Sequence, residues 1–205
     1  REGQVAQLAF SGGDVIEPLQ LRPNAGSAEG DRKQGTTVRV WPDGKYFESS
    51  ALPLQELTHI LRSKAVLMPG VTVSLTQEKT KDTQQWLYKG GLRDYLLQTI
   101  SQDPVILPFE GSGFADKNNE SFAEGEGAEW AVVFTEDGQA VRESFVNLIP
   151  TTAGGTHESG LREGLFNAVK NFIELHALLP KGVKLMPEDV FARASFVLSV
   201  KVLDP

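Results

Sequence analysis

The most constraining feature of the sequence is an apolar stripe with helical spacing near its C-terminal end. The stripe is formed by Leu161, Leu165, Ala168, Phe172 and Leu175. Spacings of three and four residues place these side chains on one face of a helix. Thr156 suits the N-cap and Pro180 stops the pattern, so a helix over Thr156–Leu179 is predicted, on the order of 35 Å long. Such a face has to be buried against another layer.

Alternating residues nearby supply that layer. Phe196–Val202 alternates with a period of two and predicts a closing strand, after a helical turn or two at Pro187–Arg193. Trp130–Phe134 and Val141–Leu148 are predicted to form an antiparallel pair, turned by Glu136-Asp137-Gly138. The long helix is therefore expected to pack on a sheet that contains Val141–Leu148 and Phe196–Val202.

The first half of the chain mixes short strands with two helices. Strands are predicted at Ala6–Phe10, Val15–Leu21, Gly35–Trp41, Val71–Leu75 and Gln84–Lys89, and helices at Pro53–Val66 and Gly90–Ile100. Segments rich in Gly, Pro and polar residues predict loops at Arg22–Gln34 and Gly111–Gly127, the second of them mobile. Prolines at 104 and 108 place a domain boundary near Ser101–Pro108.

Composition excludes several classes of protein. The chain has 205 residues, of which 40% are hydrophobic and 23% charged, as in an ordinary globular protein. No apolar run is long enough to cross a membrane, and the chain has no cysteine for a disulfide or a thiolate metal site. The net charge of −7 and scattered basic residues argue against a DNA-binding face on this chain.

No set of residues forms a catalytic constellation by spacing alone. His59, His157 and His176 stand apart from one another, which disfavours a metal site. Gly154–His157 precedes a helix and could hold a phosphate, but it lacks the Lys-Ser/Thr of a P-loop, so a plain strand-to-helix turn is favoured. The residues alone indicate an α+β protein of unknown role.

Ordered motifs along the chain resemble those of one enzyme family. They are Gln34–Asp43 (QGTTVRVWPD), Leu61–Val71 (LRSKAVLMPGV), Ile149-Pro150-Thr151, Gly154–His157 (GGTH), Gly160-Leu161-Arg162, Ser199–Val202 (SVKV) and Asp204-Pro205. Together they are similar to the B (ATPase) subunits of bacterial type IIA DNA topoisomerases. Leu179–Lys184 and Lys64–Pro69 favour the topoisomerase IV branch over gyrase.

The resemblance implies a domain organisation. Residues 1–101 would be the second half of a GHKL-type ATPase domain, an antiparallel sheet with helices. Residues 102–205 would be a transducer domain, a βαβ-containing sheet with one long helix, truncated before the Gln-Thr-Lys loop of the family. The general base, the Mg²⁺-binding Asn, the adenine-binding Asp and the glycine-rich lid of the family would precede Arg1.

The resemblance also implies a ligand site. Thr36 matches a threonine near the adenine ring of ATP, Val38 its apolar neighbour, and Arg1 an arginine at the pocket mouth used by aminocoumarin inhibitors. Taken without the resemblance, Thr36 and Val38 favour simple strand packing. No catalytic residue and no metal ligand is assigned within the chain. ATP and Mg²⁺ are expected for the parent protein, and neither is expected to bind well to this piece, which should hydrolyse no ATP.

The implied function is the coupling of ATP hydrolysis to DNA strand passage by a cytoplasmic, nucleoid-associated bacterial enzyme. The implied partners are the topoisomerase A subunits in a heterotetramer, a second copy of the B chain when ATP binds, and DNA in the full enzyme, with no membrane. Two alternatives stay open: a mechanical transducer or interaction module without ligand chemistry, and another GHKL ATPase such as a mismatch-repair protein.

Overall fold

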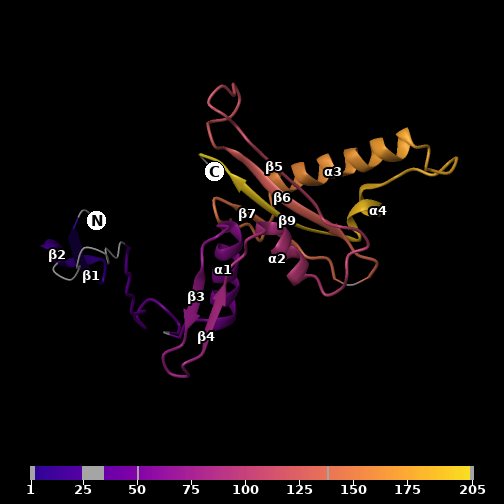
Figure 1. Ribbon diagram of the computed structural model, residues 1–205. Helices are drawn as coiled ribbons and strands as arrows, with labels where there is room; N and C mark the ends of the chain where they lie inside the picture. Colours follow the sequence, from indigo (N-terminus) through magenta and orange to yellow (C-terminus); the bar gives the residue numbers. More distant parts are fainter. Residues whose placement is uncertain (1–2, 25–34, 50, 138, 204–205) are drawn as a thin grey trace. The chain divides into compact units, whose positions relative to one another are not determined.

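The computed structural model describes residues 3–24, 35–49, 51–137 and 139–203. Contacts between residues divide the chain into two compact units, Arg1–Leu52 and Pro53–Pro205, which we call unit 1 and unit 2. Each unit is described separately below, and Figure 1 labels the helices and strands of both.

Unit 1 contains an antiparallel hairpin of strands β1 (Gln4–Ser11) and β2 (Asp14–Pro23), as the alternation predicted. Gly12 and Gly13 form the turn with φ values of +60° and +97°, a region that glycine enters without steric cost. The apolar side chains of both strands are largely exposed within the unit.

The strand predicted at Gly35–Trp41 is wrong, because these residues form no ladder with any described strand. A strand depends on a neighbour that accepts and donates its backbone hydrogen bonds. β1 and β2 pair only with each other, so the alternating pattern of 35–41 has no partner among the described residues.

Unit 2 is built on a five-stranded sheet with the order β5-β6-β9-β7-β8. Its strands are β5 (Phe109–Phe114), β6 (Gly127–Phe134), β7 (Arg142–Val146), β8 (Ile149–Pro150) and β9 (Ala194–Lys201). β7 and β9 run parallel, whereas the other neighbours run antiparallel. The chain between β7 and β9 contains a long helix, so this part is the βαβ arrangement that the resemblance implied.

Helices cover both faces of this sheet. On one face lie α1 (Leu54–Leu67) and α2 (Gly91–Thr99), and on the other lie α3 (Thr156–Leu175) and α4 (Pro187–Phe191). A short antiparallel ribbon, β3 (Val73–Thr76) with β4 (Thr83–Trp86), connects α1 to α2. The sequence predicted both ribbon strands and all four helical segments.

Along the central strands, alternate side chains point to opposite faces of the sheet. Val133 and Val197 join α1 and α2 in one apolar cluster, whereas Val132 and Phe196 face Leu165 of α3 in another. β9 is therefore buried on both sides along most of its length, and the only polar residues among its six buried positions are Ser195 and Ser199. The predicted packing of the long helix on a sheet containing β7 and β9 is confirmed.

Two local predictions are corrected by the structure. β6 and β7 are not an antiparallel pair, because β9 lies between them. The loop predicted at Gly111–Gly127 begins as strand β5, and Gly111 allows this because a Cβ there would lie 2.7 Å from the Trp130 ring. The remaining turn is held by backbone bonds from Ala115 to Glu126 and from Gly125 to Ala115.

The long helix starts at Thr156 as predicted, but the prediction that Thr156 is its N-cap is wrong, and the helix ends earlier than predicted. Gly155 is the N-cap and Thr156 is the first helical residue. The helix stops at Leu175 and not at Leu179, because Ala177 has φ +50° and turns the backbone into the left-handed region. Leu175, at the end of the predicted stripe, is consequently 81% exposed.

The expected division into residues 1–101 and 102–205 concerns the domains of a longer protein and stays a prediction. Within this chain, α1 and α2 share one buried cluster with β6, β7 and β9. Residues on both sides of Ser101–Pro108 therefore contribute to the same core.

Candidate functional site

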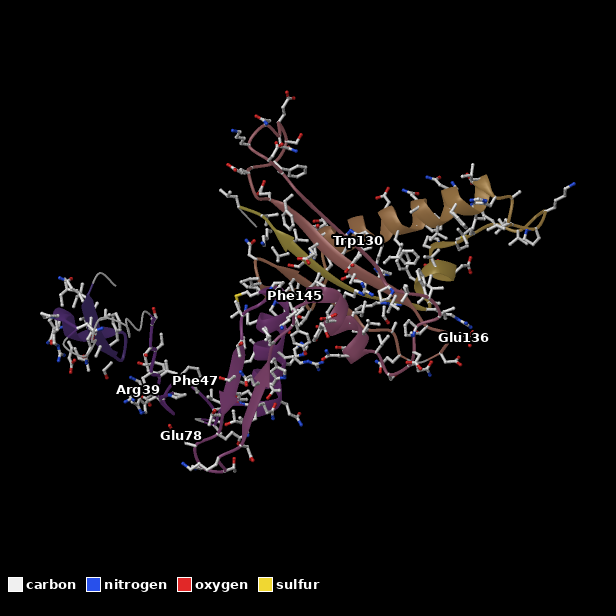
Figure 2. All side chains as sticks on the ribbon, in the orientation of Figure 1. Arg39, Phe47, Glu78, Trp130, Glu136 and Phe145 are labelled. Carbon is white, nitrogen blue, oxygen red and sulfur yellow. The ribbon has the colours of Figure 1, made fainter. Side chains whose placement is uncertain are left out.

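The predicted nucleotide-contacting residues lie in a segment of unit 1 that forms neither a helix nor a strand. Thr36 is exposed, and Val38 is 77% exposed within that unit. Figure 2 labels Arg39 in the same segment. The third residue of the expected site, Arg1, lies outside the described residues. The assignment of Thr36 and Val38 to an adenine pocket therefore stays a prediction.

A cavity of about 420 Å³ lies among α3, α4, the end of β6 and the segment Val105-Ile106. Its lining is mainly apolar, and the charged residues that contribute are Glu136 (labelled in Figure 2), Asp189 and Arg193. Two carboxylates against one guanidinium disfavour a triphosphate there. This cavity is therefore a poor candidate for the nucleotide site.

A polar network connects α1 and α2 to strand β7. Tyr95 of α2 donates its hydroxyl to the carboxylate of Glu143, at 2.8 Å and 3.0 Å from the two oxygens. Arg62 of α1 lies with its guanidinium carbon 5.0 Å from the centre of the Tyr95 ring and donates Nε to the Tyr88 hydroxyl at 2.7 Å. The two tyrosine rings meet edge to face at 5.9 Å. The network fixes two helices relative to the sheet.

Burial and charge determine the ionisation of Tyr95. Desolvation of the ring, followed by the negative charge of Glu143, raises the pKa of Tyr95 far above its usual value of 10.0. The phenol therefore stays protonated and donates its hydrogen bond to Glu143 across the neutral pH range. Tyr95 thus acts here as a structural donor.

A second network surrounds the start of α3, at the GGTH motif. The Ser144 and Thr151 hydroxyls lie 2.7 Å apart, and Thr151 Oγ1 lies 3.0 Å from Nε2 of His157. Ser144 is buried in β7, so this chain of contacts fixes the first turn of α3 on the sheet. The structure gives the motif a positioning role, consistent with the strand-to-helix turn favoured by the sequence.

Arg162 of the Gly-Leu-Arg motif anchors α3 further along. Its guanidinium pairs with Glu158 at 3.1 Å and lies 5.2 Å and 5.8 Å from the ring centres of Phe191 and Phe196. These contacts join α3 to α4 and β9. The sequence did not predict these contacts, because both phenylalanines lie far along the chain from Arg162.

The described part of the chain offers no arrangement for a metal ion. Among its residues, no group of three or more His, Asp or Glu side chains is placed to hold one. None of the helices described has the length and apolar character needed to span a membrane.

The fold and the ordered motifs define an α+β protein of the kind found in type IIA topoisomerase B subunits, and comparison with known proteins agrees. The DNA gyrase B family matches residues 91–205. The B subunit of DNA topoisomerase 4 from Escherichia coli is 41% identical over the whole chain, and that from Pseudomonas aeruginosa is 44% identical. The chain belongs to the DNA gyrase B family. It spans 31% of the length of these relatives.

Solved structures give the same result for the fold. A structure described as the topoisomerase IV ATP binding domain of Francisella tularensis, in complex with a small-molecule inhibitor, matches all of this chain and 53% of its own, with a TM-score of 0.75 and 30% identity. The 43K ATPase domain of Thermus thermophilus gyrase B, in complex with an aminocoumarin, matches all of this chain and 54% of its own. Its TM-score of 0.71 at 23% identity supports the fold alone. The predicted fold class and family resemblance are confirmed.

Proposed function

We propose that this chain is part of the ATPase and transducer region of a type IIA DNA topoisomerase, in a B subunit of the topoisomerase IV type. The complete protein would couple ATP binding and hydrolysis to DNA strand passage, and so decatenate and relax DNA. The observation that carries the proposal is the similarity of the whole chain, at 41–44% identity, to proteins of that name. Similarity along the entire length supports a shared role more strongly than one shared motif.

The remaining parts of the proposal concern ligands and partners. ATP is proposed as the nucleotide, since a solved relative is described as an ATP binding domain. Mg²⁺, the topoisomerase A subunits, a second copy of the B chain and DNA are proposed as partners of the complete protein, with action in the bacterial cytoplasm at the nucleoid. Residues 1–101 and 102–205 are proposed as parts of its ATPase and transducer domains.

A mechanical role is the second candidate, and it is compatible with the first. The Tyr95–Glu143 bonds and the Ser144–Thr151–His157 contacts fix helices to one sheet, which suits a unit that transmits displacement. Such a unit would need no ligand of its own.

The test of the function uses the complete protein with its A-type partner and interlinked DNA circles. We expect ATP-dependent separation of the circles, and no magnesium-dependent ATP turnover by residues 1–205 alone. A complete protein that assembles with its partner but neither hydrolyses ATP nor separates circles would favour the purely mechanical role.

The test of the site uses Thr36→Val, which keeps the shape of the side chain and removes its hydroxyl. Loss of one hydrogen bond to an uncharged partner should weaken ligand binding by about two- to tenfold. The effect should be larger for an inhibitor bonded directly than for ATP bonded through water. Thr37→Val is the matched control, because it removes the same hydroxyl from the neighbouring residue, which is not part of the proposed site. Isothermal titration of the complete protein in which Thr36→Val leaves both affinities unchanged would make Thr36 a packing residue.

A further inference from the structure

The turn between β7 and β8 has an unusual backbone for its sequence. It consists of Asn147 and Leu148, with φ values of +48° and +68°. A two-residue hairpin turn commonly has positive φ at both positions, and the preferred pair is Asn-Gly. Leu148 stands where glycine is preferred, and a bulky side chain is strained there. Contacts elsewhere have to offset that strain.

Two contacts of Leu148 with the α1 side of unit 2 do so. Its side chain packs against the buried cluster that α1 and α2 share with the sheet. Its carbonyl oxygen accepts a hydrogen bond from Nζ of Lys64 in α1, 84 residues earlier in the chain. Glycine would relieve the strain at this position, but it has no side chain to insert into the cluster. Leu148 therefore ties the turn to α1.

Asn147 ties the same turn to the end of β9. Its side-chain amide donates to the Val202 carbonyl at 2.7 Å, and its Oδ1 accepts from the Val202 amide at 3.0 Å. Its own backbone amide donates to the Val200 carbonyl at 2.9 Å. β9 ends at Lys201, so the Asn147 side chain bonds to both the amide and the carbonyl of Val202, the first residue beyond the strand.

Glu126 holds the next residue from the opposite side. Its Oε1 accepts from the Leu203 amide at 2.6 Å, and its Oε2 accepts from the Ala123 amide at 2.8 Å. These bonds leave the path of the chain beyond β9 fixed by the side chains of Asn147 and Glu126. Of the two, only Asn147 lies in a turn that also contacts α1.

We infer that the Asn147-Leu148 turn is a mechanical junction that couples the position of α1 to the path of the chain as it leaves β9. The two residues share one strained turn, so neither can move without disturbing the other. A displacement of α1 moves Leu148, because Lys64 and the buried cluster connect them. Asn147 then moves with Leu148 and displaces Val202 through its side-chain hydrogen bonds. The coupling is a property of unit 2 and does not depend on the proposed function. A role of the coupling in signalling ATP binding would rest on the proposed function.

The experiment measures amide hydrogen exchange, resolved to single residues by mass spectrometry, in the purified protein. Asn147→Gly keeps the positive φ and removes the side chain, so exchange at the Val202 amide should accelerate about three- to tenfold. Lys64→Met keeps the apolar stem and removes the donor. Although Lys64 bonds to neither Val202 nor Leu203, this change should accelerate exchange at Val202 about two- to fivefold.

Lys170→Met is the matched control, since Lys170 is an exposed residue of α3 that pairs with Glu174, and it should leave Val202 unchanged. Protection of the buried Val197 amide reports whether each variant is folded. If Lys64→Met does not fold, Leu148→Gly replaces it, because glycine suits the turn but loses the contact with the cluster. Wild-type exchange at Val202 in every folded variant of Lys64 or Leu148 would overturn the junction and leave the proposed function intact.

Discussion

Replacing Tyr95 by phenylalanine would remove a single hydroxyl from the network between α2 and β7. The ring would keep its buried position and its contact with the Arg62 guanidinium, so the change isolates the bonds to Glu143. A hydrogen bond to a charged group contributes about 1.5–3 kcal/mol to folding. Glu143 is partly exposed and can recover water, so we expect the lower part of that range.

Chemical denaturation near neutral pH measures this free energy of unfolding directly. For a unit of this size, a loss of about 1.5–3 kcal/mol corresponds to a fall of about 3–12 °C in melting temperature. The double variant with Glu143→Gln tests whether the effect comes from the pair, since the two changes should couple by about 1 kcal/mol or more. Tyr46→Phe is the control, because Tyr46 is 61% exposed and its hydroxyl has no hydrogen bond among the described residues.

The reasoning would be refuted by a Tyr95→Phe variant within about 0.5 kcal/mol of the wild type, the range of ordinary surface changes. A large loss without coupling to Glu143 would show that the hydroxyl acts through some other contact.

Three further outcomes follow from the same structure. Because folding raises the pKa of Tyr95, the stability that depends on its protonated form is fully present below pH 10.0 and is lost as the pH rises above that value. The free energy of unfolding should therefore be lower at pH 11 than at pH 9, and Tyr95→Phe should reduce this difference. Phe145→Ala should lower the free energy of unfolding by about 3–5 kcal/mol, since Phe145 is buried where α1 and α2 meet the sheet (Figure 2); a loss below about 1 kcal/mol would contradict that packing. Gly111→Ala should destabilise by about 1–3 kcal/mol, because its Cβ would press on the Trp130 ring, whereas Gly113→Ala in the same strand meets open space and should have a smaller effect.

Local periodicity predicted the helices and most strands, because those patterns depend on neighbours within a few residues. The apolar stripe of α3 is a clear instance, and its early end at Leu175 depends on the backbone of Ala177. Local periodicity does not predict which strands pair, because pairing depends on contacts between segments that lie far apart in the sequence. Nothing local in Trp130–Phe134 indicates that β9, far later in the chain, takes the place next to it.

The candidate site follows from resemblance more than from geometry. Thr36 and Val38 belong to the motif QGTTVRVWPD, and their alternation is only weak support, since the segment forms no strand. The networks around Tyr95 and His157 could not be predicted at all. Glu143 lies 48 residues from Tyr95, and only the folded sheet brings them together.

The position of β9 has a consequence for how unit 2 folds. Among the described residues of unit 2, β9 is the last strand in sequence, yet it lies in the middle of the sheet, between β6 and β7. The β5–β6 hairpin and the β7–β8 hairpin have no ladder to each other, so backbone pairing joins them only when β9 takes its place between them. Its pairing with β6 joins residues as far apart as Gly127 and Lys201. Contacts between such distant residues slow folding, because the intervening chain loses entropy before they form. During synthesis, the sheet therefore closes only after α3 and β9 have both been made.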